Sequence, residues 1–135
     1  MEMKNFFQKL FTGSRETEVP KVVKLNFEER FSQSINVEWQ KVDGQFEAVF
    51  YRDDLENIAI FEKDGTMICL KTNLPLTALP ENVAQNARKE GELMNAIQIE
   101  CTGELEFELI VRDESLVRYF LLIDEKGQIL KKDKL

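Results

Sequence analysis

The segment from Gln45 to Leu70 alternates between apolar and polar residues, and this pattern predicts antiparallel strands. Phe46, Ala48 and Phe50 occupy every second position, so their side chains would share one buried face of a strand. Residues that favour tight turns separate this strand from its neighbours on both sides. The turn pairs are Asp43-Gly44, Asp53-Asp54 and Asp64-Gly65. With the alternating stretch that precedes Asp43, the pattern predicts a meander of four strands.

An amphipathic helix is predicted just before this meander. Val23, Phe27 and Phe31 are spaced four residues apart, which places them on one helical face, while charged residues occupy the other face. Pro20 suits the start of such a helix because its missing N–H would have no intrahelical partner there. No good N-cap residue is present, so the helix must be stabilised mainly by packing.

The same pattern recurs about sixty residues later. Pro80 lies 60 positions after Pro20, Val83 lies 60 positions after Val23, and Gly127 lies 62 positions after Gly65. We therefore predict an α+β fold of two tandem helix-plus-four-stranded-antiparallel-meander repeats, which form one sheet with the helices on one face. The predicted divisions are a leader over residues 1–18 and a single domain over 19–135, with repeat one at 19–72, a linker at 73–78 and repeat two at 79–132.

The charge balance excludes several classes of function. The chain has 135 residues and a formal net charge of −7, and its lysines and arginines are scattered among carboxylates, so no nucleic-acid surface is expected. It contains no histidine, which removes the commonest general base and the commonest metal ligand. No catalytic constellation, metal site or cofactor site is predicted, and an enzymatic function is not expected.

The two cysteines, Cys69 and Cys101, lie inside apolar strand-like runs. Their surroundings favour buried free thiols, and a cross-strand disulfide is the alternative. The N-terminus lacks a convincing signal-peptide pattern and no apolar run is long enough for a membrane span, so a cytoplasmic location is expected.

The leader has an apolar face of its own, formed by Phe6, Phe7, Leu10 and Phe11. Lys4 and Lys9 flank this face, as in helices that lie on a membrane surface or dock on a partner. A helix that packs on its own domain, or a frayed tail, is the alternative. On the first interpretation the chain is a membrane-peripheral or assembly protein.

The face of the predicted sheet turned away from the helices is the candidate binding surface. The alternation predicts that it carries Glu38, Gln40, Glu47, Val49 and Tyr51 in repeat one, and Glu100, Glu106, Glu108 and Arg112 in repeat two. An acidic face with embedded apolar and aromatic groups fits recognition of an unknown protein or peptide. A solvated sheet face with protective charges is the alternative interpretation.

The repeat resembles a known group of proteins. The segments VPKVVKLNFEERFSQSINVEWQKVDGQFEAVF and IFEKDG, and more weakly LPENVAQNARKEGELMNAIQIE and LIDEKG, are similar to the PepSY-like group of beta-lactamase-inhibitor-like (BLIP-like) proteins. The resemblance covers residues 19 to about 132. It implies the tandem helix-plus-meander fold and an open sheet face for protein binding, and it brings no catalytic residues with it.

Overall fold

The computed structural model describes residues 18–135 and confirms the α+β class, with eight antiparallel strands and two α-helices in that range. The helices are α2 (Lys21–Arg30) and α3 (Glu81–Arg88). The strands are β1 (Ile35–Val42), β2 (Gln45–Arg52), β3 (Leu55–Phe61), β4 (Met67–Asn73), β5 (Glu92–Cys101), β6 (Glu104–Arg112), β7 (Arg118–Asp124) and β8 (Ile129–Lys134). A short 3₁₀ turn, Leu76–Ala78, precedes α3. The chain divides into two compact units, with the boundary between Thr72 and Asn73.

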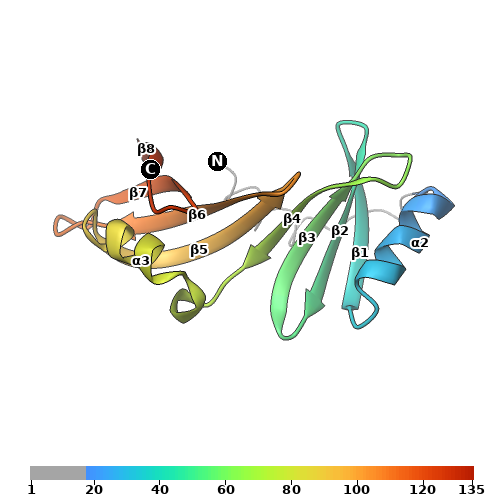
Figure 1. Ribbon diagram of the computed structural model, residues 1–135, viewed down its shortest axis with the longest axis horizontal. Coiled ribbons are helices and arrows are strands. Elements are labelled where there is room, and N and C mark those ends of the chain that lie inside the picture. The colour runs from blue at the N-terminus through green and yellow to red at the C-terminus, as the bar shows by residue number, and fades with distance from the viewer. Residues whose placement is uncertain (1–17) are drawn as a thin grey trace. The chain divides into compact units, whose positions relative to one another are not determined.

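The first unit consists of α2 and the meander β1 to β4, in which each strand pairs antiparallel with the next (Figure 1). Asp43 and Gly44 both have positive φ, of 50° and 79°, and so do Asp53 and Asp54, at 53° and 62°. Positive φ at both central residues defines the two-residue hairpin turn that matches the twist of its strands. The predicted turns therefore lie where the sequence placed them.

The core of the first unit is aromatic. Phe27 of α2 packs edge-on against Trp39 of β1 and Phe50 of β2, with ring centroids 5.2 and 5.0 Å apart. Edge-to-face pairs of this kind are favourable beyond the area that they bury. No side chain caps the N-terminus of α2, and the Pro20 carbonyl instead accepts the backbone N–H groups of Val23 and Lys24. Packing therefore holds the helix, as predicted.

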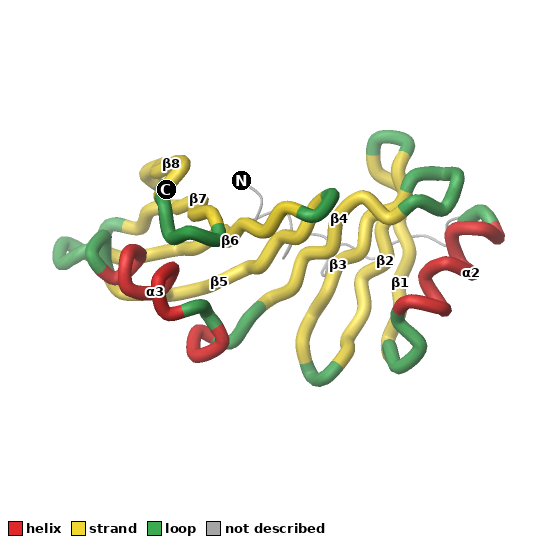
Figure 2. The backbone as a smooth tube through the Cα atoms, viewed as in Figure 1, coloured by secondary structure: helices red, strands yellow, loops and turns green. Residues whose placement is uncertain are grey.

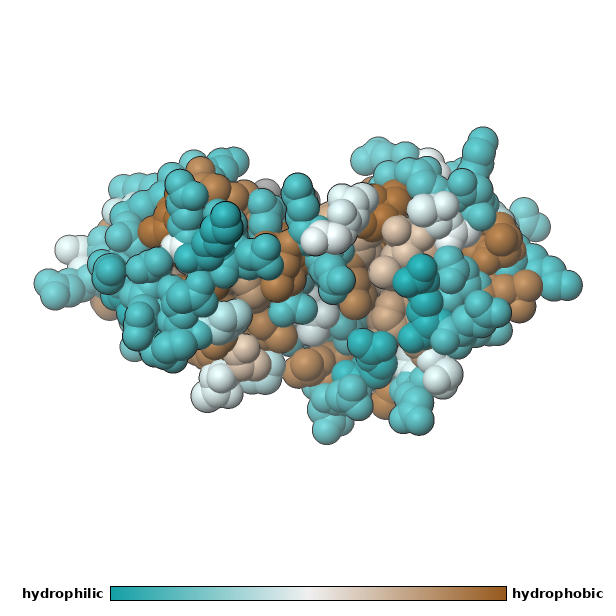
Figure 3. Space-filling model, viewed as in Figure 1, coloured by the Kyte–Doolittle hydropathy of each residue, from teal (hydrophilic) through white to brown (hydrophobic). Residues whose placement is uncertain are grey.

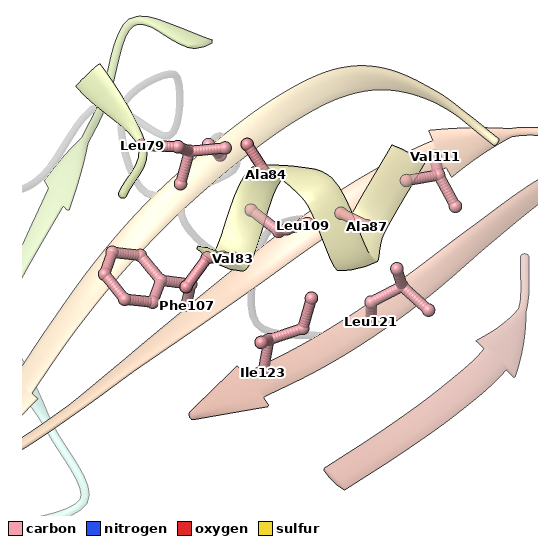
Figure 4. Packing of buried hydrophobic residues seen from close by; sticks show 10 residues of the cluster. Leu79, Val83, Ala84, Ala87, Phe107, Leu109, Val111, Leu121 and Ile123 are labelled. Carbon is pink, nitrogen blue, oxygen red and sulfur yellow. The ribbon is translucent and has the colours of Figure 1, made fainter. Parts of the chain in front are cut away.

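The second unit repeats the order of elements, with α3 followed by the meander β5 to β8 (Figure 2). Its core is aliphatic. Val83, Ala84 and Ala87 of α3 lie over Leu109 and neighbouring residues of β6 and β7 (Figure 4). Small side chains on a helix allow it to approach a sheet closely, so this unit has a tighter helix–sheet contact than a phenylalanine-bearing helix permits.

Two sequence-based expectations need comment. The leader face of Phe6, Phe7, Leu10 and Phe11 lies outside the described residues. The expectation of free thiols is wrong, because Cys69 and Cys101 are both disulfide-bonded. Apolar surroundings suit a half-cystine as well as a thiol, so the local sequence pattern does not distinguish the two.

Candidate binding face

We call the side of each meander turned away from its helix the distal face. In an antiparallel pair, residues directly opposite each other point to the same side, so the register assigns every strand residue to a face. In the first unit, Glu38 pairs with Val49 and Gln40 pairs with Glu47. The side chains of these four residues point to the opposite side of the sheet from the core residues Trp39 and Ala48. Tyr51 pairs with Glu56 in the next strand. The five residues predicted in this unit therefore share the distal face.

The distal face of the first unit has an apolar centre. Val49 and Ile58 are cross-strand partners, and only 6% and 1% of their surfaces are exposed. Ile60 beside them is half-buried. Polar residues surround this centre: Glu38, Gln40, Tyr51, Glu56 and Lys71. Because Val49 and Ile58 are buried, the surface that this face offers to a partner consists of the half-buried Ile60 and the surrounding polar residues.

The polar rim is internally linked. Gln40 Nε2 donates to Glu47 Oε1 over 3.4 Å, and Glu47 itself is buried. Tyr51 is hydrogen-bonded to Glu56, its cross-strand partner. Burial raises the pKa of Tyr51 above its usual value of 10.0, and the charge of Glu56 and this hydrogen bond raise it further. The phenol is therefore held neutral as a hydrogen-bonding group on the distal face.

The distal face of the second unit mixes aliphatic side chains with charges. Glu106, Glu108 and Arg112 of β6 lie on it, as predicted from their alternation with the core residues Phe107 and Leu109. The partly exposed aliphatic residues of this face are Ile99, Ile110 and Leu122. The face is therefore amphipathic.

Two of these charges have contrasting settings. Arg112 Nη2 contacts Glu92 Oε1 at 2.7 Å, and both side chains are accessible to solvent, so the pair adds little to stability. Glu108 is buried beside its cross-strand partners Ile97 and Leu122. Of these two charges, the guanidinium of Arg112 is therefore the one that a partner can reach.

The predicted position of Glu100 is wrong. Glu100 pairs with Leu105, and Gln98 pairs with Phe107, so both point to the side of α3. Ile97 and Ile99 lie on the distal face instead. The physical reason is the position of the hairpin turn. Thr102-Gly103 follows Asp43-Gly44 by 59 positions rather than 60, so Gln98 and not Ile99 takes the place of Trp39, and a shift of one residue moves each side chain to the other face.

Sequence alternation also missed how much of the distal face is covered. Ile58 and Ile97 are each 1% exposed although neither contacts its unit's helix-facing core cluster. The available signal was the apolar run in each strand, since a strand that is buried on both sides has no clean alternation. In β3 that run is Ile58, Ala59 and Ile60, and in β5 it is Ala96 and Ile97.

Other kinds of site find no support in the described part of the chain. Residues 18–135 contain no group of three or more Asp, Glu or Cys side chains arranged to hold a metal ion. In the same range, no helix combines the length and the apolar character needed to cross a membrane. The distal faces are therefore the surfaces to compare with known proteins.

No protein-family model matches the chain, and no curated protein matches it in sequence. Solved structures do. A Bacteroides eggerthii protein described as periplasmic superposes with a TM-score of 0.78 at 15% identity, covering 87% of this chain and 90% of the other. A DUF2874 family protein from Bacteroides ovatus gives 0.77 at 19% identity, covering 88% and 89%. A BLIP-like protein from Bacteroides fragilis gives 0.75 at 15% identity, with 89% of each chain covered.

At these identities the comparisons establish the fold. They agree with the BLIP-like resemblance carried by the Val-Pro helix openings and the Asp-Gly turns, and they add the DUF2874 proteins to it. The chain therefore has the fold shared by the DUF2874 and BLIP-like proteins, a fold group without an established function.

Proposed function

We propose that this chain is a non-enzymatic protein- or peptide-binding module of inhibitor-like type, and that its distal faces make the contacts. The observation that carries the proposal is the accessible part of the distal face of the first unit, where the half-buried Ile60 and Tyr51 lie among Glu38, Gln40 and Glu56. Interfaces obtain most of their binding energy from a few buried aromatic or apolar groups, while surrounding polar groups set specificity. The BLIP-like description of one structural neighbour also supports a binding role.

The charge of the two faces defines the partner that fits them. Glu38 and Glu56 on the first unit and Glu106 on the second give acidic rims, and the chain as a whole is negative. Arg112 and Lys131 add accessible cations on the second unit. A partner with mainly basic side chains around an apolar anchor would be attracted to the acidic groups and would contact the partly exposed aliphatic residues Ile60, Ile99 and Ile110.

Selection of peptides from a displayed random library against the full chain tests this function. We expect the enriched peptides to combine Lys or Arg with an aromatic or aliphatic anchor. Tyr51→Ala and Glu106→Lys should each weaken their binding by about tenfold or more, the loss expected of a central contact. Glu81→Lys on the surface of α3 is the matched control and should leave binding unchanged. Binding that is equal in all three variants would overturn the proposal.

We also propose that the two units are copies of one repeat. The support is a shared link between helix and turn, in which an Asn side chain of the helix donates to the carbonyl of the glycine in the last turn of its unit. Asn26 donates to Gly65 in the first unit and Asn86 to Gly127 in the second. The helix residues are 60 positions apart and the glycines 62, the same spacing as the remainder of the pattern.

Finally, we propose that the chain functions in an oxidising compartment. Disulfides persist in such compartments and are rare in the reducing cytoplasm, and both cysteines of this chain are disulfide-bonded. The description of a structural neighbour as periplasmic supports the same location. Labelling of intact cells and of lysates with a thiol reagent, before and after reduction, tests it. If both cysteines of the chain react with the thiol reagent before any reductant is added, the proposed location is contradicted.

A further inference from the structure

The outer edge of β1 is unpaired within residues 18–135, since β1 pairs with β2 on one side only. Which backbone groups point outward follows from the hairpin. In a two-residue turn the closing residues, here Val42 and Gln45, exchange both of their hydrogen bonds. Alternation then directs the backbone N–H and C=O groups of Trp39 and Lys41 away from β2, so they are available to another strand.

This edge is weakly protected in comparison with the outer strand of the second unit. Strand β8 carries Lys131, Lys132 and Lys134, and lysines on an outer strand discourage further pairing. Strand β1 instead exposes Ile35 and Val37, by 61% and 36%. A bulge separates Ile35 from Glu38, and the run from Glu38 to Val42 is regular. That regular run is suited to accept a neighbour.

A groove of about 410 Å³ lies between β1 and α2, next to this edge. Phe27 and Phe31 of the helix and Val37 and Trp39 of the strand form its apolar wall. Val22 and Leu25 are half-exposed on another side of α2, where they line a pocket with Gly65 and Met67, and apolar surface is visible beside that helix in Figure 3. Outward backbone groups therefore lie beside an apolar surface, which is the combination that strand addition uses.

The charges that line the groove on α2 are self-complementary. Lys24 and Glu28 lie one turn apart on the helix, and both line the groove. A two-fold axis through the edge of β1 would place two copies of α2 antiparallel on the same side of the joined sheets. Lys24 of each copy would then approach Glu28 of the other, as a symmetric interface requires.

We propose that this chain forms a dimer with a second copy of itself through antiparallel pairing of the β1 edges. In the register centred on Gln40, Trp39 lies opposite Lys41 of the second copy and Glu38 lies opposite Val42. The outward backbone groups of Trp39 and Lys41 then pair with each other across the axis. Trp39 gains a cation over its ring, and no like charges are opposed. Glu38 and Gln40 lie at the margin of both this contact and the distal face, but the pairing uses the backbone edge of β1 and does not depend on the proposed function.

The test is the mass of the full chain in solution, measured by sedimentation over a range of protein concentrations. We expect a monomer–dimer equilibrium that Val42→Glu shifts to monomer, because Val42 lies opposite Glu38 of the second copy and the variant would oppose like charges at both symmetric contacts. Leu130→Lys is the control. Leu130 is exposed on the outer strand β8, which takes no part in the proposed contact, so this variant should leave the equilibrium unchanged.

A charge exchange tests the orientation of the two copies. Lys24→Glu opposes like charges at both symmetric contacts and should raise the dissociation constant about tenfold, by roughly 0.7 kcal/mol per contact. The double variant Lys24→Glu/Glu28→Lys should restore the original value. Thermal unfolding of each variant verifies that it folds. A monomer at all concentrations, or a dimer indifferent to both Val42→Glu and the exchange, would overturn the proposal, as would a monomer that pairs this edge with a peptide instead.

Discussion

Asn86 Nδ2 donates a hydrogen bond of 2.6 Å to the carbonyl oxygen of Gly127, and so links α3 to the β7–β8 turn of the second unit. The link spans 41 positions in sequence and is part-buried. Asn86→Ala removes the donor and leaves the carbonyl without it, so we expect the free energy of unfolding to fall by about 1–2 kcal/mol. Chemical denaturation measures the loss. Gln85→Ala on the exposed side of α3 is the control, and an equal effect from both variants would contradict a specific role for the link.

Gly127 also lies close to the helix. A Cβ atom added there would meet Asn86 Nδ2 at 2.8 Å and the Asn82 carbonyl oxygen at 3.1 Å. Gly103 has a similar φ, 82° against 89°, with open space around it. Gly103→Ala should therefore cost about 1–2 kcal/mol, the price of a left-handed backbone alone. Gly127→Ala should cost about 1–3 kcal/mol more because of crowding. Equal losses in denaturation experiments would show that the turn moves freely away from α3.

A buried polar pair stabilises the first unit. Thr72 Oγ1 donates to Asn57 Oδ1 over 2.8 Å, and both side chains are buried on the side of α2. Thr72→Val keeps the shape but removes the donor, so we expect a loss of about 1–3 kcal/mol in the free energy of unfolding. Thr72→Ser keeps the hydroxyl and should cost less. A valine variant as stable as the native protein would mean that the Asn57 oxygen finds another donor.

The phenol of Tyr51 gives the distal face a pH dependence. Its pKa is raised above 10.0 first by burial, then by the charge of Glu56 and their hydrogen bond. The folded chain therefore holds this proton more tightly than the unfolded chain does. The associated stability is complete below pH 10 and is lost as the pH rises through the folded-state pKa.

Glu56→Gln removes the carboxylate charge, so we expect the pKa of Tyr51 to fall while staying above its usual value. Phenolate absorbance, followed in a Tyr119→Phe background that leaves Tyr51 as the chain's one tyrosine, measures the change. An unchanged titration would mean that Glu56 does not act on the phenol.

The disulfide-bonded state of Cys69 and Cys101 predicts the outcome of thiol counting. The isolated protein should contain no reactive thiol after unfolding without reductant, and two after reduction. Intact mass should rise by two hydrogens on reduction. Two reactive thiols in the unreduced, unfolded chain would contradict the assignment.

Local signals explain what the sequence predicted well. The Asp43-Gly44 turn needs positive φ at both central residues, and few other pairs accept that conformation, so its position could be recognised from two residues. Helix α2 could also be predicted from the sequence, because Val23 and Phe27 recur at the helical period. Glu38 and Tyr51 were assigned to the distal face from alternation next to the unambiguous core residues Phe46 and Phe50.

Long-range packing explains what the sequence did not predict. Period-two alternation in β5 permits either Ala96 or Ile97 to face the helix, and the choice depends on the register with β6, which a one-residue difference in turn position reverses. The bonding state of Cys69 is not encoded in its local sequence, because apolar neighbours suit a thiol and a half-cystine alike. Ile58 is buried although it lies on the distal face. The alternation of residues within β3 says nothing about what covers that face, so it could not predict this burial.

The separate cores of the two units have a consequence for how the chain can evolve. The rings around Phe27 and the small side chains around Ala84 and Ala87 solve two packing problems that share no residue. A substitution that reshapes one core requires no compensating change in the other. Natural selection can therefore remodel one unit toward a new partner while the other keeps its established structure.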